Sequence, residues 1–291
     1  METHTEYVED GGLRFLIHVL ANLSRKEKAR KQQGKSAPAN PFLPYDPDLY
    51  VTDISPTHLC LLNKFNVVDN HFLIVTRAYE PQEHWLTQGD FEAIAHCVSE
   101  LDGLVFFNGG TAAGASQPHK HVQDNPRDSS KSRSKEAYST VFPIEGIIQS
   151  ASIQTAPTSD SHNTPLKSTD LPFHHAILPL ENSNSENLSS QSSAEDIKSI
   201  AAQYLNSYHM LLSAVGITSR NQWQGTQSAP YNFLCTRHWM MIVPRSQEKH
   251  AGISVNSLGF VGSLLVKDSA TLEELKTMGP LHLLRSVSCQ A

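Results

Sequence analysis

Two pairs of short apolar runs constrain the fold of this chain more than any other feature of its sequence. Residues 59–65 and 71–76 form the first pair, and residues 231–236 and 239–244 form the second. Each run has the length of a β-strand, and only a few polar or turn-forming residues separate the members of a pair. Because so short a connection makes neighbouring strands run in opposite directions, the sequence predicts two antiparallel β-hairpins.

Helical periodicity lies between and after these hairpins. Apolar side chains recur every three or four residues in residues 91–101, and residues 194–215 have the spacing of an amphipathic helix. Residues 104–107 are a short apolar run that ends at Asn108-Gly-Gly, and residues 171–178 contain a further candidate strand. Helices that alternate with hairpins are typical of α+β proteins. We therefore expect an antiparallel sheet with flanking helices rather than a doubly wound parallel sheet.

The overall charge and the cysteines exclude several classes of protein. The chain has 291 residues, a net charge of −6 and a pI near 6.2, whereas a dedicated nucleic-acid binder carries a basic surplus. Its four cysteines have no C-x-x-C spacing, which favours free thiols in a reducing compartment over a disulfide scaffold. No apolar run reaches the length of a membrane span, and residues 1–6 lack a signal-peptide core. We expect a cytoplasmic protein that binds neither nucleic acid nor a membrane.

Two polar segments divide the sequence. Residues 124–136 are crowded with Asp, Ser, Lys and Arg, and residues 181–193 consist mostly of Ser, Asn and Glu. Such compositions bury little apolar surface, and they predict loops. We therefore expect a catalytic region in residues 1–180 that contains the first loop, then the second loop, then a C-terminal region in residues 194–291.

The densest functional signal is the segment Gly114-Ala-Ser-Gln-Pro-His-Lys-His-Val-Gln123. If this segment continues as a strand, the period-two spacing of His119, His121 and Gln123 places their side chains on one face. The glycines and Ser116 just before them would supply backbone amides and a hydroxyl near that face. Clustered amides bind anions without adding a formal charge.

A face of this kind is suited to chemistry at phosphorus. A neutral histidine that is held at one ring nitrogen can attack with the other, while a second histidine and a glutamine orient it or donate to phosphate oxygens. A bare His-x-His pair is as often a structural pair, and alternate strand histidines also ligate zinc or copper, with His174 and His175 as further ligands. No cysteine or carboxylate lies at ligand spacing near the pair, and glutamine is a poor transition-metal ligand. Phosphorus chemistry therefore ranks above metal ligation.

The motif and two distant segments resemble one family. The string Gly-Ala-Ser-Gln-x-His-x-His-x-Gln is specific to the ATP adenylyltransferases, also called diadenosine tetraphosphate phosphorylases, of the histidine-triad superfamily. Residues 61–77 are similar to the family's N-terminal hairpin, and residues 231–245 and 253–260 are similar to its C-terminal domain. The resemblance covers most of residues 11–267. It implies a histidine-triad-like antiparallel sheet with a C-terminal extension that completes the nucleotide site.

The resemblance also implies a two-step nucleotidyl transfer. His121 would attack the α-phosphorus of diadenosine 5′,5‴-P1,P4-tetraphosphate (Ap4A) to give an adenylyl-histidine and ATP, and inorganic phosphate would then remove the adenylyl group as ADP. His119 and Gln123 are the other implied catalytic residues. Gln123 stands where the hydrolase branch has a third histidine, which favours transfer over hydrolysis. The implied substrate-binding residues are Lys35, Asn63, Lys64, Asn108, Gly114, Ala115, Ser116, Gln117, Thr236, Met241 and Arg245.

The same resemblance sets expectations for ligands and leaves two alternatives. The implied partners are Ap4A, ATP, ADP and phosphate, with no covalently bound cofactor and no metal ligand from the protein. A divalent ion such as Mg²⁺ would accompany the polyphosphate, and the oligomeric state is open. A hexose-1-phosphate uridylyltransferase-like enzyme shares the His-x-His-x-Gln arrangement but typically has His-Pro-His. A non-catalytic nucleotide-binding regulator would keep the pocket without turnover.

One departure from the family pattern follows the motif directly. Family members usually continue after the glutamine with an apolar, proline-rich stretch. This chain continues with Asp124-Asn-Pro-Arg-Asp, which is polar.

Overall fold

Antiparallel strands dominate the computed structural model of this protein, which describes residues 3–20, 40–64, 71–126, 142–154, 164–180 and 192–290. The strands are β1 (Thr3–Asp10), β2 (Leu13–Leu20), β3 (Tyr50–Asp53), β4 (His58–Leu62), β5 (Phe72–Thr76), β6 (Gly103–Gly109), β7 (His121–Pro126), β8 (Ala176–Pro179), β9 (Tyr231–Cys235), β10 (Trp239–Pro244), β11 (Lys249–His250), β12 (Ile253–Ser254) and β13 (Ser263–Val266). The α-helices are α2 (Gln88–Glu100), α4 (Glu145–Gln154), α6 (Ala194–Ala214), α7 (Ser269–Met278) and α8 (Pro280–Val287), and the 3₁₀ helices are η1 (Pro47–Leu49), η2 (Thr111–Ala113) and η3 (Ser257–Val261).

Eight strands form the central sheet in the order β3-β4-β5-β7-β6-β9-β10-β8. Every neighbouring pair in it is antiparallel, and the two predicted hairpins are confirmed as β4–β5 and β9–β10. The end of the histidine motif forms β7, between β5 and β6 in the middle of this sheet. The predicted α+β class with an antiparallel sheet and flanking helices is therefore confirmed.

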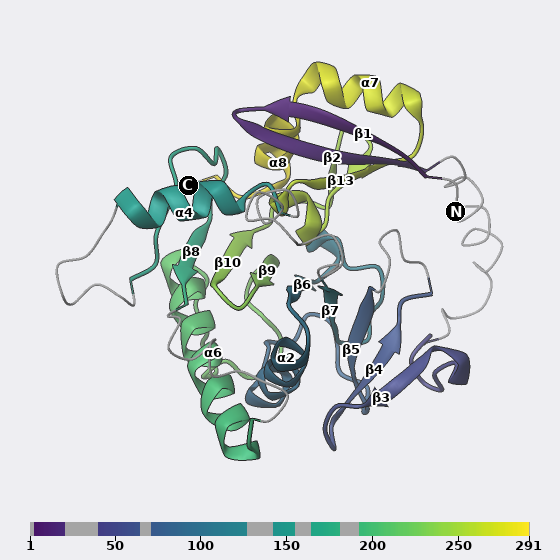
Figure 1. Cartoon of the computed structure of the whole chain (residues 1–291), viewed down its shortest axis with the longest axis vertical. Helices are drawn as coiled ribbons and strands as arrows, with labels where there is room; N and C mark the ends of the chain where they lie inside the picture. Colours follow the sequence, from purple (N-terminus) through teal and green to yellow (C-terminus); the bar gives the residue numbers. More distant parts are fainter. Residues whose placement is uncertain are drawn as a thin grey trace.

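Helices α2 and α6 pack against each other and cover one face of the central sheet (Figure 1). Both were expected from their periodicity, and each begins with a capping box, at Thr87 for α2 and at Ser193 for α6. Their apolar faces join the sheet in one core, where Phe91 of α2 and Tyr208 of α6 both contact the ring of Phe233. Burial of these faces, more than helix propensity, stabilises the two helices.

A smaller unit packs on the sheet's other face, at the top of Figure 1. Strands β1 and β2 form an antiparallel ribbon around Gly11-Gly12, whose positive φ angles glycine adopts at little steric cost. Strand β13 pairs with β2 in parallel, and α7 and α8 pack against this three-stranded sheet. The second core joins the unit to the central sheet at Phe106 and Met241. Segments from both ends of the described chain therefore form one layer.

Two local predictions differ from the structure. Strand β7 continues to Pro126, so residues 124–126 of the segment expected to be a loop are part of the sheet. The strand expected within residues 171–178 is confined to β8, which begins only at Ala176. Residues 127–141 and 181–191 lie outside the described residues. In the described residues, no helix has the length and apolar character of a membrane span.

Candidate active site

His121 is the first residue of β7, and its ring is held in one tautomer. The ring Nδ1 lies 2.8 Å from the backbone oxygen of His119, which can only accept a hydrogen bond, so Nδ1 carries the proton. Burial lowers the pKa of His121 to about 4, so the imidazole is neutral at pH 7. The other ring nitrogen, Nε2, makes no hydrogen bond to a described residue. His121 therefore presents an unprotonated, unengaged nitrogen, as a nucleophile requires.

Both ring nitrogens of His119 are engaged in hydrogen bonds that hold the ring in place. Its Nε2 donates to the backbone oxygen of Thr76 at 2.9 Å, and its Nδ1 accepts from the side-chain amide of Asn40 at 3.0 Å. The ring of Phe42 packs against the rings of both His119 and His121, with centroids 5.6 and 5.3 Å apart. Burial lowers the pKa of His119, which also favours the neutral ring. In this geometry His119 acts on His121 through its backbone oxygen.

Gln123 lies on the same face of β7 as His121, as the spacing predicts, with Leu73 and Phe106 as its neighbours in register. His71 also lies beside this face. Burial lowers the pKa of His71 to about 4. The Nδ1 of His71 lies 3.4 Å from the side-chain nitrogen of Asn63. Asn63 is therefore joined to this face of the sheet through His71.

The loop between β6 and β7 carries the glycines of the motif. Within this loop the backbone amides of Gly114 and Ala115 donate to Thr111 and Gly110. The amides of Ser116 and Gln117 donate to no described residue, so both are free to bind an anion. Of the predicted amide donors, Ser116 and Gln117 are thus placed to bind an anion, whereas Gly114 and Ala115 shape the turn.

A close approach of the chain explains the glycine at position 114. Gly114 has φ +90°, and a side-chain carbon there would lie 2.7 Å from the backbone oxygen of Val255. Any other residue would push the loop away from the segment that follows β12. Gly114 therefore lets the C-terminal part of the chain support the loop.

A buried amide network lies beneath the loop. The side-chain oxygen of Asn108 accepts from the Asn232 side chain at 2.8 Å and from both the backbone nitrogen and the hydroxyl of Ser257 at 2.9 and 2.8 Å. Arg245 donates to Asn232 at 2.6 Å and to the backbone oxygen of Ala113 at 3.2 Å. These bonds fix the Asn108 amide so that its nitrogen is the end left without a partner among the described residues.

The residue between the two histidines points to the other side of the sheet, as expected for a strand. Lys120 is fully buried, and its ammonium lies 2.6 Å from Asp90 and 3.1 Å from Glu80. Asp90 also binds the ring of His58 at 3.0 Å. Burial opposes ionisation of Asp90, but the His58 hydrogen bond and the Lys120 charge keep its pKa well below the usual value. This ion pair ties the start of β7 to the first turn of α2.

The structure does not bring every predicted residue to this cluster. Thr236 follows β9 at the end of the sheet opposite the glycine loop, where its hydroxyl accepts from the amides of the β9–β10 turn. Met241 lies on the site's face of the sheet but on β10, beyond β6 and β9, and it is fully buried in the second core. Lys64 is exposed and pairs with Asp46 at 3.5 Å. Lys35 lies outside the described residues.

The two further histidines that a metal site would need lie elsewhere. His174 and His175 lie just before β8, at the edge of the sheet, and each ring bonds to backbone groups near it. Across the described part of the chain, no three His, Cys, Asp or Glu side chains are close enough together to hold a metal ion.

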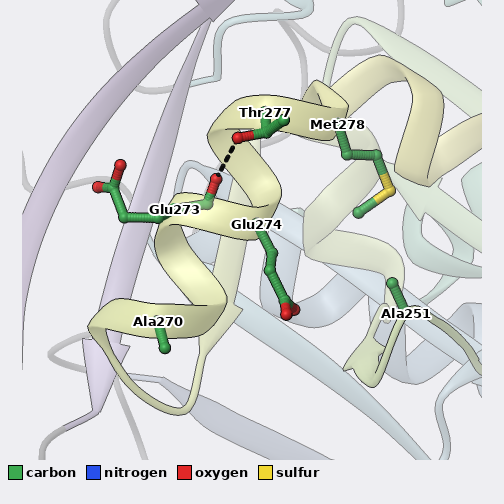
Figure 2. Close-up of a pocket in the computed structure, with 6 residues that line it drawn as sticks. All are labelled: Ala251, Ala270, Glu273, Glu274, Thr277 and Met278. Atoms are coloured by element: carbon green, nitrogen blue, oxygen red, sulfur yellow. Dashed lines mark hydrogen bonds between the residues drawn. The ribbon is translucent and has the colours of Figure 1, made fainter.

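A surface hollow on α7 is separate from this site. Figure 2 shows the residues that line it: Ala270, Glu273, Glu274, Thr277 and Met278 of α7, and Ala251. It lies on the smaller unit at the top of Figure 1, away from β7. None of its lining residues is a predicted site residue, so the chemistry of the motif does not extend to it.

Sequence reasoning missed several residues that shape the site, including Asn40, Phe42 and Thr76 around the histidine rings, and also His71, Gln82, Asn232 and Ser257. His71 starts a predicted strand, and its alternation with Leu73 could have placed it on the site's face. Asn232, a polar residue in an apolar strand, was a second usable signal. Gln82 and Ser257 lie outside regular strands, and no pattern in the sequence distinguishes them.

Two family models match almost the whole chain. The Ap4A phosphorylase N-terminal domain matches residues 1–150, and the ATP adenylyltransferase C-terminal domain matches residues 169–290. Diadenosine 5′,5‴-P1,P4-tetraphosphate phosphorylase 2 of Saccharomyces cerevisiae is 30% identical in an alignment 278 residues long that covers 90% of this chain and 78% of that protein. Protein APA1 of the same yeast is 25% identical in an alignment 292 residues long that covers 94% of this chain and 83% of that protein.

Solved structures agree on the fold. The crystal structure of yeast Ap4A phosphorylase Apa2 matches with a TM-score of 0.70 at 24% identity and covers 99% of this chain and 87% of that one. The same yeast protein has been solved in complex with Ap4A, again with a TM-score of 0.70, 24% identity and coverage of 99% and 90%. The motif, the sheet around it and both family models lead to one conclusion: the chain is a nucleotidyltransferase that belongs to the Ap4A phosphorylase, or ATP adenylyltransferase, family.

Proposed function

We propose that this enzyme phosphorolyses Ap4A to ATP and ADP through a covalent adenylyl group on His121. The observation that carries the proposal is the state of the His121 ring, neutral at pH 7 with its proton on Nδ1 and its Nε2 unengaged. The family supports the class of reaction, and the yeast relative crystallised with Ap4A supports the substrate.

In the first step the Nε2 of His121 attacks the α-phosphorus of Ap4A. A nitrogen–phosphorus bond forms, the bond from that phosphorus to the bridging oxygen breaks, and ATP leaves with the bonding electrons. The ring becomes positively charged, and its Nδ1 proton stays on the hydrogen bond to His119. That backbone oxygen stabilises the charge as it develops and keeps the ring aligned.

The oxygens of the α-phosphate need donors during this step. We assign the backbone amides of Ser116 and Gln117, the side-chain nitrogen of Asn108 and the amide of Gln123 to this task. The first three donate to no described residue, and Gln123 lies on the same face of β7 as His121. Preorganised donors of this kind lower the barrier because they need no reorientation as charge moves.

In the second step an oxygen of inorganic phosphate attacks the adenylyl phosphorus. The nitrogen–phosphorus bond breaks, ADP forms and the neutral ring is restored. Gln123 is uncharged and cannot relay a proton from water, so the intermediate persists until phosphate, an anion already equipped to attack, arrives. This property favours transfer over hydrolysis.

The remaining predicted residues have less direct roles in this proposal. Lys35 and Lys64 neutralise the distal phosphates, and Mg²⁺ accompanies the polyphosphate. Arg245, buried and bonded to Asn232 and Ala113, supports the loop instead of contacting a phosphate. Thr236 and Met241 contribute to the packing of β9 and β10.

A product assay with and without phosphate tests the proposal. With phosphate, Ap4A should give equal amounts of ATP and ADP. Without phosphate, the reaction should stop after one ATP per protein and leave an adenylyl-protein that intact-mass spectrometry detects. His121→Asn should abolish both signals, while His96→Asn, which alters an exposed histidine on α2, should retain them. Formation of AMP as the main product, independent of phosphate, would refute phosphorolysis.

A further inference from the structure

We propose that Gln82 is a positioning residue for His121, whose side-chain amide replaces a missing peptide group of the sheet. The inference rests on the proposed function, because it concerns the residue assigned as nucleophile. It adds a residue from outside the histidine motif to the machinery of the site.

The pairing between β6 and β7 stops just before the nucleophile. Its last facing pair is Phe106 and Gln123, and continuation of the same register would bring Asn108 opposite His121. On its other side β6 stays paired with β9 as far as Gly109, and β7 pairs with β5 up to His121. The gap is therefore local: the two strands separate only where the glycine loop leaves the sheet.

The amide of Gln82 fills this gap. Its side-chain oxygen accepts from the backbone nitrogen of His121 at 2.8 Å, and its side-chain nitrogen donates to the backbone oxygens of His121 and Asn108 at 3.1 and 3.0 Å. Gln82 is only 1% exposed, so water does not take over these bonds. A primary amide offers the same donor and acceptor as a peptide group, and it satisfies backbone groups that would otherwise be buried without partners.

The segment that carries Gln82 is itself tied to the motif. The backbone nitrogen of Gln82 donates to the oxygen of Pro118 at 2.8 Å, and that of Lys120 donates to the oxygen of Glu80 at 2.7 Å. The side chain of Gln82 thus starts from a backbone that is fixed against residues 118–120 and reaches the next residue along, His121. Little freedom remains in the amide, so it can hold the nucleophile's backbone in one position.

This support matters for the reaction because the His121 ring takes its orientation from the backbone. Its Nδ1 proton is bound to the oxygen of His119, two residues away in the same strand segment. A shift of the His121 backbone towards the gap would change both this hydrogen bond and the line along which Nε2 meets phosphorus. A misplacement of about 1 Å can cost about 100-fold in rate.

The first test compares two glutamines that both bind β6. Gln82→Met keeps the length of the side chain but removes all three hydrogen bonds. Gln227→Met removes the bond from Gln227 to the backbone oxygen of Gly109, also on β6, at 2.6 Å, and Gln227 makes no hydrogen bond to His121. The measurement is the rate of the ATP burst from Ap4A without phosphate, alongside the thermal midpoint of each protein. We expect Gln82→Met to slow the burst by about 100-fold with little change in KM, and Gln227→Met to leave the burst at the wild-type rate.

The second test uses protonation to restore the missing donor. In Gln82→Glu a protonated carboxyl has one donor and one acceptor, like the amide, whereas the ionised carboxylate faces two backbone oxygens with no proton to offer. Burial raises the pKa of such a carboxyl. The burst rate of Gln82→Glu relative to wild type should therefore rise as pH falls from 8 towards 5, with the folded state checked by circular dichroism at each pH.

The outcomes separate the two proposals. A wild-type protein that gives no ATP burst contradicts the proposed function. With a wild-type burst in place, two results overturn the role of Gln82: a Gln82→Met burst no slower than that of Gln227→Met, or a Gln82→Glu rate below wild type by the same factor at every pH. Loss of folding in Gln82→Met leaves the pH dependence of Gln82→Glu as the deciding measurement.

Discussion

Asp124 is a carboxylic acid in a part of the sheet that offers it no partner. It follows Gln123 on β7, where its neighbours in register are Phe72 and Val105, and its side chain is fully buried on the face that α2 covers. Neither carboxyl oxygen has a hydrogen-bond partner within the described residues. Burial, with a smaller contribution from Asp102, raises the pKa of Asp124 to about 7.

This shift makes the stability of the fold depend on pH. The unfolded chain has an ordinary aspartate, with a pKa of about 3.8. Below that pH the Asp124 carboxyl is protonated in both the folded and the unfolded state. Its ionisation then takes nothing from the free energy of unfolding. As pH rises from there to 7 only the unfolded state ionises, so stability falls, at about 1.4 kcal/mol per pH unit. The whole loss is about 4 kcal/mol, and it is complete once pH passes the folded-state pKa.

Asp124→Asn removes the titration while keeping the size of the side chain. Relative to wild type, the variant should gain about 2.5 kcal/mol in free energy of unfolding between pH 5 and pH 8. Urea titrations followed by tryptophan fluorescence at four pH values would measure the gain, with Asp170→Asn, an exposed aspartate, as the control. A difference between Asp124→Asn and wild type that stays constant from pH 5 to pH 8 would refute the reasoning.

Two further predictions concern the motif. Because burial lowers the pKa of His121 to about 4, the rate of the ATP burst should be flat from pH 6 to pH 8 and fall only as pH drops through about 4, where the ring becomes protonated and cannot attack; a rapid-quench pH profile that instead declines through pH 6.5 would contradict this state of the ring. Lys120→Met leaves Asp90 buried without its cation and should destabilise the fold by about 3–5 kcal/mol in urea titrations. The double variant Lys120→Met with Asp90→Asn should recover part of that loss, and no recovery would show that the ion pair is not its source.

Local elements were predictable because their signals are local. The hairpins β4–β5 and β9–β10 and the helices α2 and α6 follow from periodicity and short connections, and all four are present. The placement of His121 and Gln123 on one face and of Lys120 on the other follows from the alternation of a strand alone.

Contacts between distant segments were not predictable in the same way. The parallel pairing of β2 with β13 joins residues that are far apart in the chain, and no period in either segment indicates its partner. The network of Asn108, Asn232 and Ser257 also joins residues that are far apart in the chain. Gln82 has its role only because β6 and β7 separate by the width of one amide. No short pattern in the sequence indicates that separation.

Asp124 shows where composition misleads. A polar run normally indicates a loop because buried polar groups cost free energy, and that rule favoured an early end to the strand. Backbone pairing on both sides of β7 overrides this preference and carries the carboxyl into the core. The free-energy cost of burying the ionised carboxyl is expressed in the raised pKa of Asp124.

The amide network beneath the loop also sets the order in which a newly made chain can become active. His121 and the glycine loop leave the ribosome early, but Asn232, Ser257 and the β13 strand that anchors the C-terminal layer follow only about 110 to 145 residues later. At roughly 5–20 residues per second, that interval is on the order of ten seconds. During it the nucleophile exists without the groups that orient the Asn108 amide. A nascent chain therefore contains its reactive histidine before it contains the residues that orient the Asn108 amide, and we expect its reactivity to appear only after Asn232 and Ser257 have been made and have folded.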